Sequence, residues 1–483
     1  MERISESEPA LGKVSSLEGS GAGQELTTPV GALVTRAPLV VSGEASVAEA
    51  ARAMREAGAS AAIVRTEPPG ILTDRDLRSR VLAEGLSPDT PVRAVMSCPL
   101  VALPAETPLF EALRRMLDHE IHHLPVTRGG EIVAVLEDTD LLRHQARSPL
   151  ALLNRIEHLQ HEEEVSGYSA EVMGVAATLF AGGLGVAQIS GAIASLGDVL
   201  ARRLLTLAEL ELGPPPCPYA WMVLGSEGRM EQVLLTDQDN AIAYLEDSDE
   251  ARAYFAELAA RVVAGLVRAG FPPCPGGYMA TNWCRPLADW KTLFRGWVDV
   301  PEPQALLEAQ IFFDFRGVHG GLSLEPLEGI LLSAGRRELF LAHLARAALR
   351  GRPPLRFRGR LRTDDGMIDL KAGGIAATVM LARAYALAAG SGARPTLERL
   401  LDAAEARTLS RSAAEILAES FRFLIRLRLQ EQLRSARSGE EPTNRVRVEA
   451  LTELERRRLA EAFEAVRKLQ DATAVRFNAG GIA

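Results

Sequence analysis

The sequence predicts a multi-domain protein that combines α/β domains with an all-α part. Three observations lead to this fold class: a βαββα pattern that occurs twice before residue 148, a strand–turn–helix–strand pattern around residue 225, and helical periodicity from about residue 321 to the end. At 483 residues the chain is too long for a single core. We therefore expect about three domains joined by linkers.

The composition excludes several classes of protein. Hydrophobic residues make up 47% and charged residues 24%, as in ordinary globular domains. A net charge of -9 gives no general attraction to phosphate backbones, so no nucleic-acid partner is expected. The four cysteines lack CxxC spacing, which argues against a zinc site or a disulfide framework and fits a cytoplasmic protein.

Two further segments were tested for a secretion signal and for a membrane span. Residues 1–27 are rich in Ser, Glu and Gly and lack an apolar signal core, so we expect a disordered tail. The uncharged run between Glu171 and Asp198 is diluted by glycine and small polar residues. It predicts a buried or interfacial helix, and no membrane association is expected.

Residues 28–147 contain an internal repeat with an offset of about 62 residues, a period typical of duplicated modules. The first copy contains APLVVSGEASVAEAARAM and GILTDRDL, and the second contains CPLVALPAETPLFEALRRM and IVAVLEDTDLL. Each copy predicts a strand, an amphipathic helix, a buried strand, and a strand that leads into a helix. The adjacent pair His122-His123 points to opposite faces of a strand, which favours a structural role over a metal site.

This repeat resembles a CBS-domain pair. In that family a Thr/Ser-x-x-Asp motif at the last strand-to-helix turn binds the ribose of a nucleotide. Thr73 and Asp76 match the motif in the first copy, whereas the second copy has Glu137 in place of Thr and retains Asp140. The resemblance implies AMP or ATP as ligand and a homodimer formed through the pair. The alternative for Thr73 and Asp76 is simple capping of a helix.

A helical linker is predicted for residues 148–212, and Gly213 followed by three prolines marks its end. The next domain, residues 213–320, opens with a strand, a turn at Gly225-Ser226, a short helix and a second strand from about Thr236 to Leu245. At such a turn the backbone approaches a phosphate closely, and the helix N-terminus faces it.

Asp237 and Asp239 stand two residues apart on the second predicted strand, so their carboxylates point to the same face. Two like charges held this close repel each other unless a cation lies between them. Mg²⁺ takes hard oxygen ligands and commonly joins carboxylates to substrate phosphates. The pattern therefore predicts a magnesium site.

The string GSEGRMEQ followed by TDQDNA resembles the signature of the polymerase-β-type nucleotidyltransferase superfamily. It is similar to the PII-protein uridylyltransferase, and more closely to nucleotidyltransferases with an N-terminal CBS pair, over nearly the whole chain from residue 28. The resemblance implies uridylyl or adenylyl transfer from a nucleoside triphosphate to a hydroxyl of a protein or small molecule, with release of pyrophosphate. Asp237 and Asp239 would be the catalytic metal ligands.

The same resemblance implies roles for other residues. Gly225 and Ser226 would cradle the β- and γ-phosphates, Arg229 would pair with phosphate, and Glu231 would orient Arg229 or a metal-bound water. A third carboxylate is usual in the superfamily, and the candidates are Asp289 and Asp314. Arg316 follows Asp314 by two positions, so a buried ion pair is the alternative for Asp314.

Residues 321–483 predict a helical bundle. Within it, DGMIDLKAGGIAATVML resembles the substrate-binding helical domain that follows the catalytic domain in these nucleotidyltransferases. Lys371 would then face the catalytic cleft and bind phosphate; the alternative is an ordinary surface lysine. Arg422, Arg426 and Arg428 are expected on solvated helix faces.

Two functions remain at this stage. The first is a Mg²⁺-dependent nucleotidyltransferase regulated by adenine nucleotides at the CBS pair. The second is a non-catalytic nucleotide sensor that retains the fold. The paired aspartates favour the enzyme, because binding alone does not require two aligned carboxylates.

Overall fold

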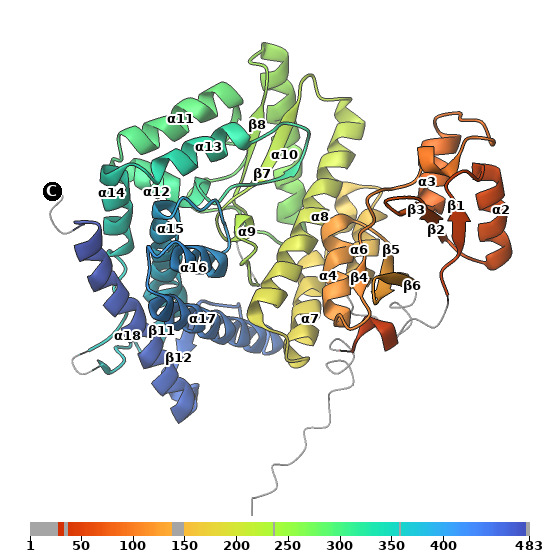
Figure 1. Ribbon diagram of the computed structural model, residues 1–483. Helices are drawn as coiled ribbons and strands as arrows, with labels where there is room; N and C mark the ends of the chain where they lie inside the picture. The colour runs from red at the N-terminus through yellow and green to blue at the C-terminus, as the bar shows by residue number, and fades with distance from the viewer. Residues whose placement is uncertain (1–27, 33–36, 138–148, 235–236, 357–358, 480–483) are drawn as a thin grey trace, which may run out of the picture.

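The computed structural model describes residues 28–32, 37–137, 149–234, 237–356 and 359–479 (Figure 1). Along the chain it contains two small sheets, a helical segment, a four-stranded sheet and a helical bundle. The predicted fold class is therefore confirmed.

The two repeats have the same topology. In each three-stranded sheet the first strand is parallel to the second and the second is antiparallel to the third. The first repeat consists of β1 (Val40–Ser42), α2 (Val47–Ala57), β2 (Ala61–Arg65), β3 (Gly70–Thr73), α3 (Asp74–Asp76) and a π-helical turn (Leu77–Leu82). The second consists of β4 (Leu103–Pro104), α4 (Leu109–His119), β5 (His123–Arg128) and β6 (Glu131–Glu137). The helix expected after β6, with Asp140, lies outside the described residues.

Local sequence explains where α2 begins and ends. The Ser46 side chain accepts a hydrogen bond from the backbone of Glu49, and the Glu49 carboxylate accepts one from the backbone of Ser46. This reciprocal pair satisfies N–H groups at the start of the helix. Gly58, with φ 60°, adopts the left-handed conformation that ends the helix.

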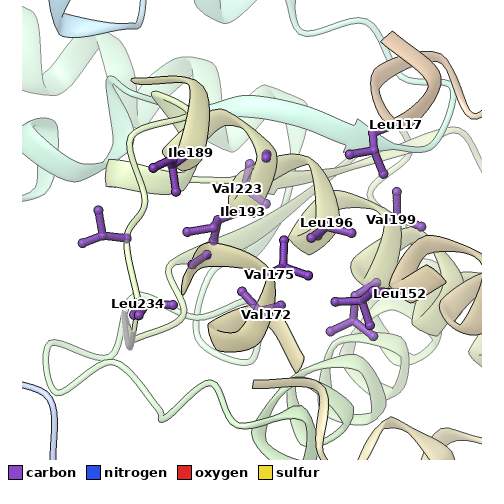
Figure 2. Packing of buried hydrophobic residues seen from close by; sticks show 14 of the residues in the cluster. Leu117, Leu152, Val172, Val175, Ile189, Ile193, Leu196, Val199, Val223 and Leu234 are labelled. Atoms are coloured by element: carbon purple, nitrogen blue, oxygen red, sulfur yellow. The ribbon is translucent and has the colours of Figure 1, made fainter. Parts of the chain in front are cut away.

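The helical segment comprises α6 (Pro149–Glu157), α7 (Tyr168–Ala181) and α8 (Val186–Leu212). Helix α8 packs against α4 of the second repeat, α6, α7 and α10. Figure 2 shows that one apolar cluster continues from α4 through α7 and α8 to the central sheet; its labelled members include Leu117, Val172, Ile193, Val199 and Val223. Among the helices of the described ranges, none combines the length and apolar content needed to cross a membrane.

The central sheet has the order β10-β7-β8-β9, and β8 and β9 are its parallel pair. Its elements are β7 (Tyr219–Val223), α9 (Gly225–Gly228), β8 (Asn240–Tyr244), α10 (Asp249–Ala269), β9 (Cys284–Pro286), α11 (Leu287–Asp299), α12 (Pro303–Phe312) and β10 (Arg316–His319). The second strand was predicted from about Thr236, but β8 begins at Asn240. Before it, Gln238 forms only an isolated bridge with Pro273, because proline has no N–H with which to extend a ladder.

The C-terminal part is the predicted helical bundle. It comprises α13 (Glu325–Ala334), α14 (Glu338–Ala348), α15 (Ala376–Ala388), α16 (Thr396–Glu405), α17 (Arg411–Arg437) and α18 (Glu453–Arg476). A small antiparallel pair, β11 (Met367–Asp369) and β12 (Arg445–Arg447), was not predicted. A π-helical turn at Lys371–Ile375 joins β11 to α15. Short 3-10 turns lie at Val30–Ala32, Val92–Ala94, Glu162–Val165 and Val448–Ala450.

Candidate active site

The acidic pair lies directly before β8. One ligand atom each from Asp237, Asp239 and the thiol of Cys274 lie within 4.8 Å of one another. Between the aspartates, Gln238 turns to the other side, where its Nε2 donates to the carbonyl oxygen of Phe271 at 3.3 Å. The extended backbone therefore brings the two carboxylates together even though the regular strand starts later.

The carboxylate of Asp239 is held in an unfavourable environment. Burial, together with the charge of Asp237, raises the pKa of Asp239 to about 6, although a hydrogen bond from Cys274 and the charge of Lys371 oppose this. Its Oδ1 is buried and has no hydrogen-bond partner among the described residues. Burial raises the pKa of Cys274 to about 11, so the thiol is protonated and donates to Asp239. A cation would relieve both the repulsion and the unpaired oxygen.

The turn at Gly225 lies against this pair. Gly225 has φ 55°, and a Cβ at this position would lie 3.1 Å from Oδ2 of Asp239. The backbone N–H of Leu224 donates to the carbonyl oxygen of Asp239 at 2.9 Å. Ser226 follows in the first turn of α9. The structure thus brings the predicted phosphate turn and the predicted metal pair to one place.

Arg229 and Glu231 are engaged with each other and with the helical bundle. The Nε of Arg229 donates to Glu231 at 2.8 Å, and its Nη1 donates to Asp314 at 2.5 Å. Glu231 also accepts from the Thr396 hydroxyl, at the start of α16, at 2.9 Å. The predicted contact of Glu231 with Arg229 is present. The predicted contact of Arg229 with phosphate stays a prediction, and in the structure its guanidinium pairs with two carboxylates.

Asp314 is fully buried in a cluster of arginines. Besides Arg229, it accepts hydrogen bonds from Arg383 and, at 2.6 Å, from Arg399. Burial opposes its ionisation, but attraction by these three cations outweighs burial and holds the pKa of Asp314 well below its ordinary value. Arg316, the partner considered from the sequence, instead binds Asp198 of α8 at 2.6 Å and 2.9 Å.

Neither predicted third carboxylate lies with the acidic pair. Asp314 forms ion pairs with three arginines, and Asp289 is exposed in the first turn of α11. The charge of Asp289 acts on Tyr244, at the end of β8 opposite the acidic pair. Among the described residues, the third group beside Asp237 and Asp239 is the thiol of Cys274. Its position in a loop, 35 residues after Asp239, gave no signal in the sequence.

Two cations of the helical bundle act on the acidic pair. Lys371 is exposed at the start of its π-helical turn, and its charge lowers the pKa of Asp239. Arg428 of α17 is 5% exposed, and its Nε donates to Oδ1 of Asn444 at 2.6 Å. Burial lowers the pKa of Arg428 to about 10, while Asp369 and Asp237 attract its charge.

Arg428 was placed wrongly from the sequence. Arg422 and Arg426 are exposed, as predicted, but Arg428 is buried. Its neighbours Leu427 and Leu429 are also buried, so this side of α17 faces the protein interior while Arg426 and Gln430 remain exposed. A charged residue between two core leucines was the available signal.

Comparison with protein families divides the chain into known parts. Residues 30–83 and 92–147 match the CBS domain, residues 170–304 match "Putative nucleotidyltransferase DUF294", and residues 338–477 match "Putative nucleotidyltransferase substrate binding domain". The chain thus combines an N-terminal CBS pair with a nucleotidyltransferase domain of the DUF294 type and the substrate-binding domain that accompanies it. In this DUF294 chain the nucleotidyltransferase match begins within α7, inside the segment predicted as a linker.

Several curated relatives are CBS domain-containing proteins, and each matches about a quarter of this chain or less. The CBS domain-containing protein CBSCBSPB3 of Arabidopsis thaliana is 37% identical over 109 residues, which is 21% of this chain and 19% of that protein. The CBS domain-containing protein YhcV of Bacillus subtilis is 33% identical over 122 residues, 24% of this chain and 87% of YhcV. An uncharacterized conserved protein from Pyrococcus horikoshii, of known crystal structure, is 32% identical with a TM-score of 0.23, covering 24% of this chain and 92% of that one.

In the CBS pair, Thr73 and Asp76 make the capping arrangement considered as the alternative. The Thr73 hydroxyl donates to Oδ2 of Asp76 at 2.7 Å, and the Thr73 N–H donates to the same oxygen at 2.9 Å. In the second copy, Glu137 accepts from the hydroxyl of Ser60 in the first copy at 2.8 Å. The motif position Glu137 of the second repeat thus joins the two repeats through Ser60.

The two histidines have separate partners. His123 is hydrogen-bonded to Ser60 at 2.7 Å, and His122 lies 3.2 Å from a carboxylate oxygen of Glu157 on α6. Both contacts join neighbouring parts of the fold. They agree with the structural role predicted for this pair.

Proposed function

We propose that this protein is a metal-dependent nucleotidyltransferase that moves a nucleoside monophosphate from a triphosphate to an acceptor hydroxyl and releases pyrophosphate. One observation carries the proposal: Asp237 and Asp239 converge beside the Gly225 turn, with a buried carboxylate oxygen that has no hydrogen-bond partner in the part of the chain that the structure describes. Such an arrangement is costly in the absence of a cation.

The residues present fit Mg²⁺. Two carboxylates provide hard oxygen ligands, and the unpaired Oδ1 of Asp239 is available to the ion. The protonated thiol of Cys274 is a poor ligand for Mg²⁺ but fixes the orientation of Asp239 by donating to it. When bound, Mg²⁺ would neutralise charge on the triphosphate and on the leaving pyrophosphate.

The chain itself supplies positioning and charge. The backbone at Gly225 and Ser226 can approach the β- and γ-phosphates, because no Cβ at Gly225 stands between the turn and the acidic pair. Lys371 and Arg428 provide positive charge from the helical bundle, so the triphosphate would be held between two domains. Asn444 fixes the Arg428 guanidinium in place.

We propose uridylyl or adenylyl transfer, with a protein or small-molecule hydroxyl as acceptor. The test is Mg²⁺-dependent pyrophosphate release from each of the four ribonucleoside triphosphates, with purified full-length protein and a cell extract as acceptor source. Release should depend on one triphosphate and vanish in the double variant Asp237→Asn, Asp239→Asn. No release from any triphosphate, with nucleotide binding intact, would contradict the proposal.

We further propose that the CBS pair binds AMP or ATP and regulates transfer, and that the pair forms a homodimer. Thr73 and Asp76 stand at a strand-to-helix turn, where a hydroxyl and a carboxylate can bind ribose. Because both groups also cap α3, Thr73→Ser should retain capping and binding, whereas Asp76→Ala should lose AMP binding in calorimetry. Equal AMP affinity in the Asp76→Ala protein would exclude this site.

One observation favours a non-catalytic sensor. The position beside the acidic pair holds Cys274 and not the third carboxylate usual in the superfamily. In that case nucleotides would bind at both sites without pyrophosphate release, and the metal would strengthen binding only. The same assay distinguishes the two functions.

A further inference from the structure

A pocket of about 390 Å³ lies where four parts of the chain meet. Its wall includes Arg114 of the second CBS repeat, the start of α8, residues 229–231 directly after α9, and the facing turns of α16 and α17. The volume falls within the range of roughly 300–1,000 Å³ typical of small-molecule sites. Apart from Arg229 and Glu231, for which the resemblance implies nucleotide-site roles, none of the residues assigned to catalysis or to the CBS ligand lines it.

The floor of the pocket contains an unused polar group. Ser190 of α8 is 1% exposed, and its hydroxyl has no hydrogen-bond partner among the described residues. Around it lie the buried apolar side chains of Val186, Phe421 and Ile425. A buried hydroxyl without a partner costs free energy, which a ligand with a donor or acceptor would recover.

Some charged side chains on the pocket wall already form ion pairs, and others do not. Arg114 is bound to Glu111 and Asp118, and Arg229 is bound to Glu231 and Asp314, so these arginines are already neutralised.

At the rim, Arg422 and Glu398 are both exposed, and neither makes an ion pair in the described part of the chain. Desolvation and the nearby charges of Asp402 and Glu231 raise the pKa of the Glu398 carboxyl group. The pocket thus offers one available cation and one available anion.

We propose that this pocket binds a zwitterionic small molecule of the free amino acid class. The ligand carboxylate would pair with Arg422 and its ammonium group with Glu398, while its side chain would reach Ser190 and the apolar floor. A nucleotide fits less well, because its several negative charges would lie next to Glu398 and Glu231. A purely apolar ligand would leave the Ser190 hydroxyl unpaired.

Such a ligand would contact the loop that continues from the Gly225 turn, together with the second CBS repeat and the helical bundle. Its binding should therefore hold these parts together and raise the melting temperature of the whole chain. Binding does not depend on transfer activity, so it can be tested without nucleotide.

The experiment is a thermal-shift screen of the full-length protein against the twenty proteinogenic amino acids, followed by calorimetry on those that stabilise it. Arg422→Gln and Glu398→Gln should each weaken binding about tenfold or more, as expected for loss of a charge-assisted hydrogen bond. Arg426→Gln is the matched control, because Arg426 is an exposed arginine one turn further along α17 and does not line the pocket.

Several outcomes would overturn the proposal. These are the absence of binding by any amino acid, affinity unchanged in both rim variants, or equally tight binding of the decarboxylated or deaminated analogue of the best ligand. Because both rim side chains are exposed, the variants should fold, and their unliganded melting temperatures should equal that of the parent protein. Loss of pyrophosphate release would leave this result unaffected, so the two proposals fail separately.

Discussion

At Gly225 the backbone conformation and the close approach of Asp239 both require glycine. Gly225→Ala should cost about 1–2 kcal/mol of folding free energy, because φ 55° is unfavourable for other residues. The added methyl would also displace the Asp239 carboxylate, which lies 3.1 Å from the Cβ position. We therefore expect pyrophosphate release to fall at least about tenfold.

The matched control is Gly58→Ala. Gly58 has φ 60°, but its Cβ would have nothing within 4 Å. This variant should lose a similar amount of stability and retain activity. Equal activity of the two variants would mean that the contact with Asp239 has no part in catalysis.

In the described residues, Asp314 is the sole carboxylate that joins three arginines, of which Arg383 and Arg399 are buried and Arg229 is nearly so. Asp314→Asn leaves buried positive charge without compensation, at a cost of about 3–5 kcal/mol. Urea unfolding measures this change. The control is Asp471→Asn, which removes an exposed pair with Arg352 and should cost less than about 1 kcal/mol. A loss below that level for Asp314→Asn would show that the cluster tolerates a neutral partner.

The raised pKa of Asp239 sets a pH dependence for metal binding. Only the ionised carboxylate binds Mg²⁺, and its pKa is about 6 instead of the ordinary 3.8. The rise in melting temperature caused by Mg²⁺ should therefore be full above about pH 7 and decrease as the pH falls through 6.

Without metal, the stability contributed by Asp239 changes with pH in the opposite direction. Its folded-state pKa lies above the unfolded value, so its ionisation destabilises the fold above about pH 6, and this cost disappears as the pH falls toward 3.8. Asp239→Asn should remove both effects. A Mg²⁺-induced shift that is identical at about pH 5 and pH 7.5 would contradict the assignment.

Helix α17 has an outer face and a face toward the catalytic domain. Arg428→Gln should raise the KM for the triphosphate about tenfold, because it removes a buried cation near Asp237. Arg428→Lys should recover part of the loss, since it keeps the charge but not the hydrogen bond to Asn444. Arg426→Gln should leave KM unchanged. An equal rise in KM for both Gln variants would point to a general electrostatic effect of the helix.

Helix α8 connects the second CBS repeat to the central sheet. On one side Ser195 donates to Asp118 of α4 at 2.7 Å, and on the other Asp198 binds Arg316 of β10. Between them lies Glu227 of α9, which is partly buried near Asp198 and Asp239; desolvation and these two charges raise the pKa of Glu227 to about 8. Helix α8 therefore connects the second repeat, through Arg316, to the backbone of α9, which begins at Gly225 beside Asp239.

For the whole molecule, the two CBS repeats differ in how they are attached. The first repeat has an apolar core of its own, whereas the second shares the large core that includes α8 and the central sheet (Figure 1). Replacing residues 33–102 by a short Gly/Ser linker should change the melting temperature of the remainder little. The linker has only a short distance to span, because Gly31 lies against Ala105.

Deleting residues 1–147 should instead expose the apolar face of α8 and lower the melting temperature by several degrees or cause aggregation. Calorimetry of the two truncated proteins tests the comparison. If both deletions have the same small effect, the shared core does not stabilise the catalytic part.

Much of this organisation was predictable from local sequence. The duplicated βαββα order, the Gly225-Ser226 turn and the bundle at the C-terminus follow from periodicity and turn chemistry, which depend on neighbouring residues. The pairing of Asp237 with Asp239 was also correct, because alternation in an extended segment is local. The same reasoning placed the start of the strand too early, since Pro273, which limits the ladder, comes from a distant loop.

Only the tertiary structure decided which distant side chains meet. Cys274 lies beside the two aspartates, and Asp314 forms ion pairs with three arginines. Arg428, which was expected on a solvated helix face, is buried where the charge of Asp237 acts on it. Each of these arrangements brings together residues far apart along the chain, and its energy depends on which buried polar group lies next to which charge. Sequence determines the local conformation and the available chemistry, but the energy of a buried charge depends on partners that only folding brings together.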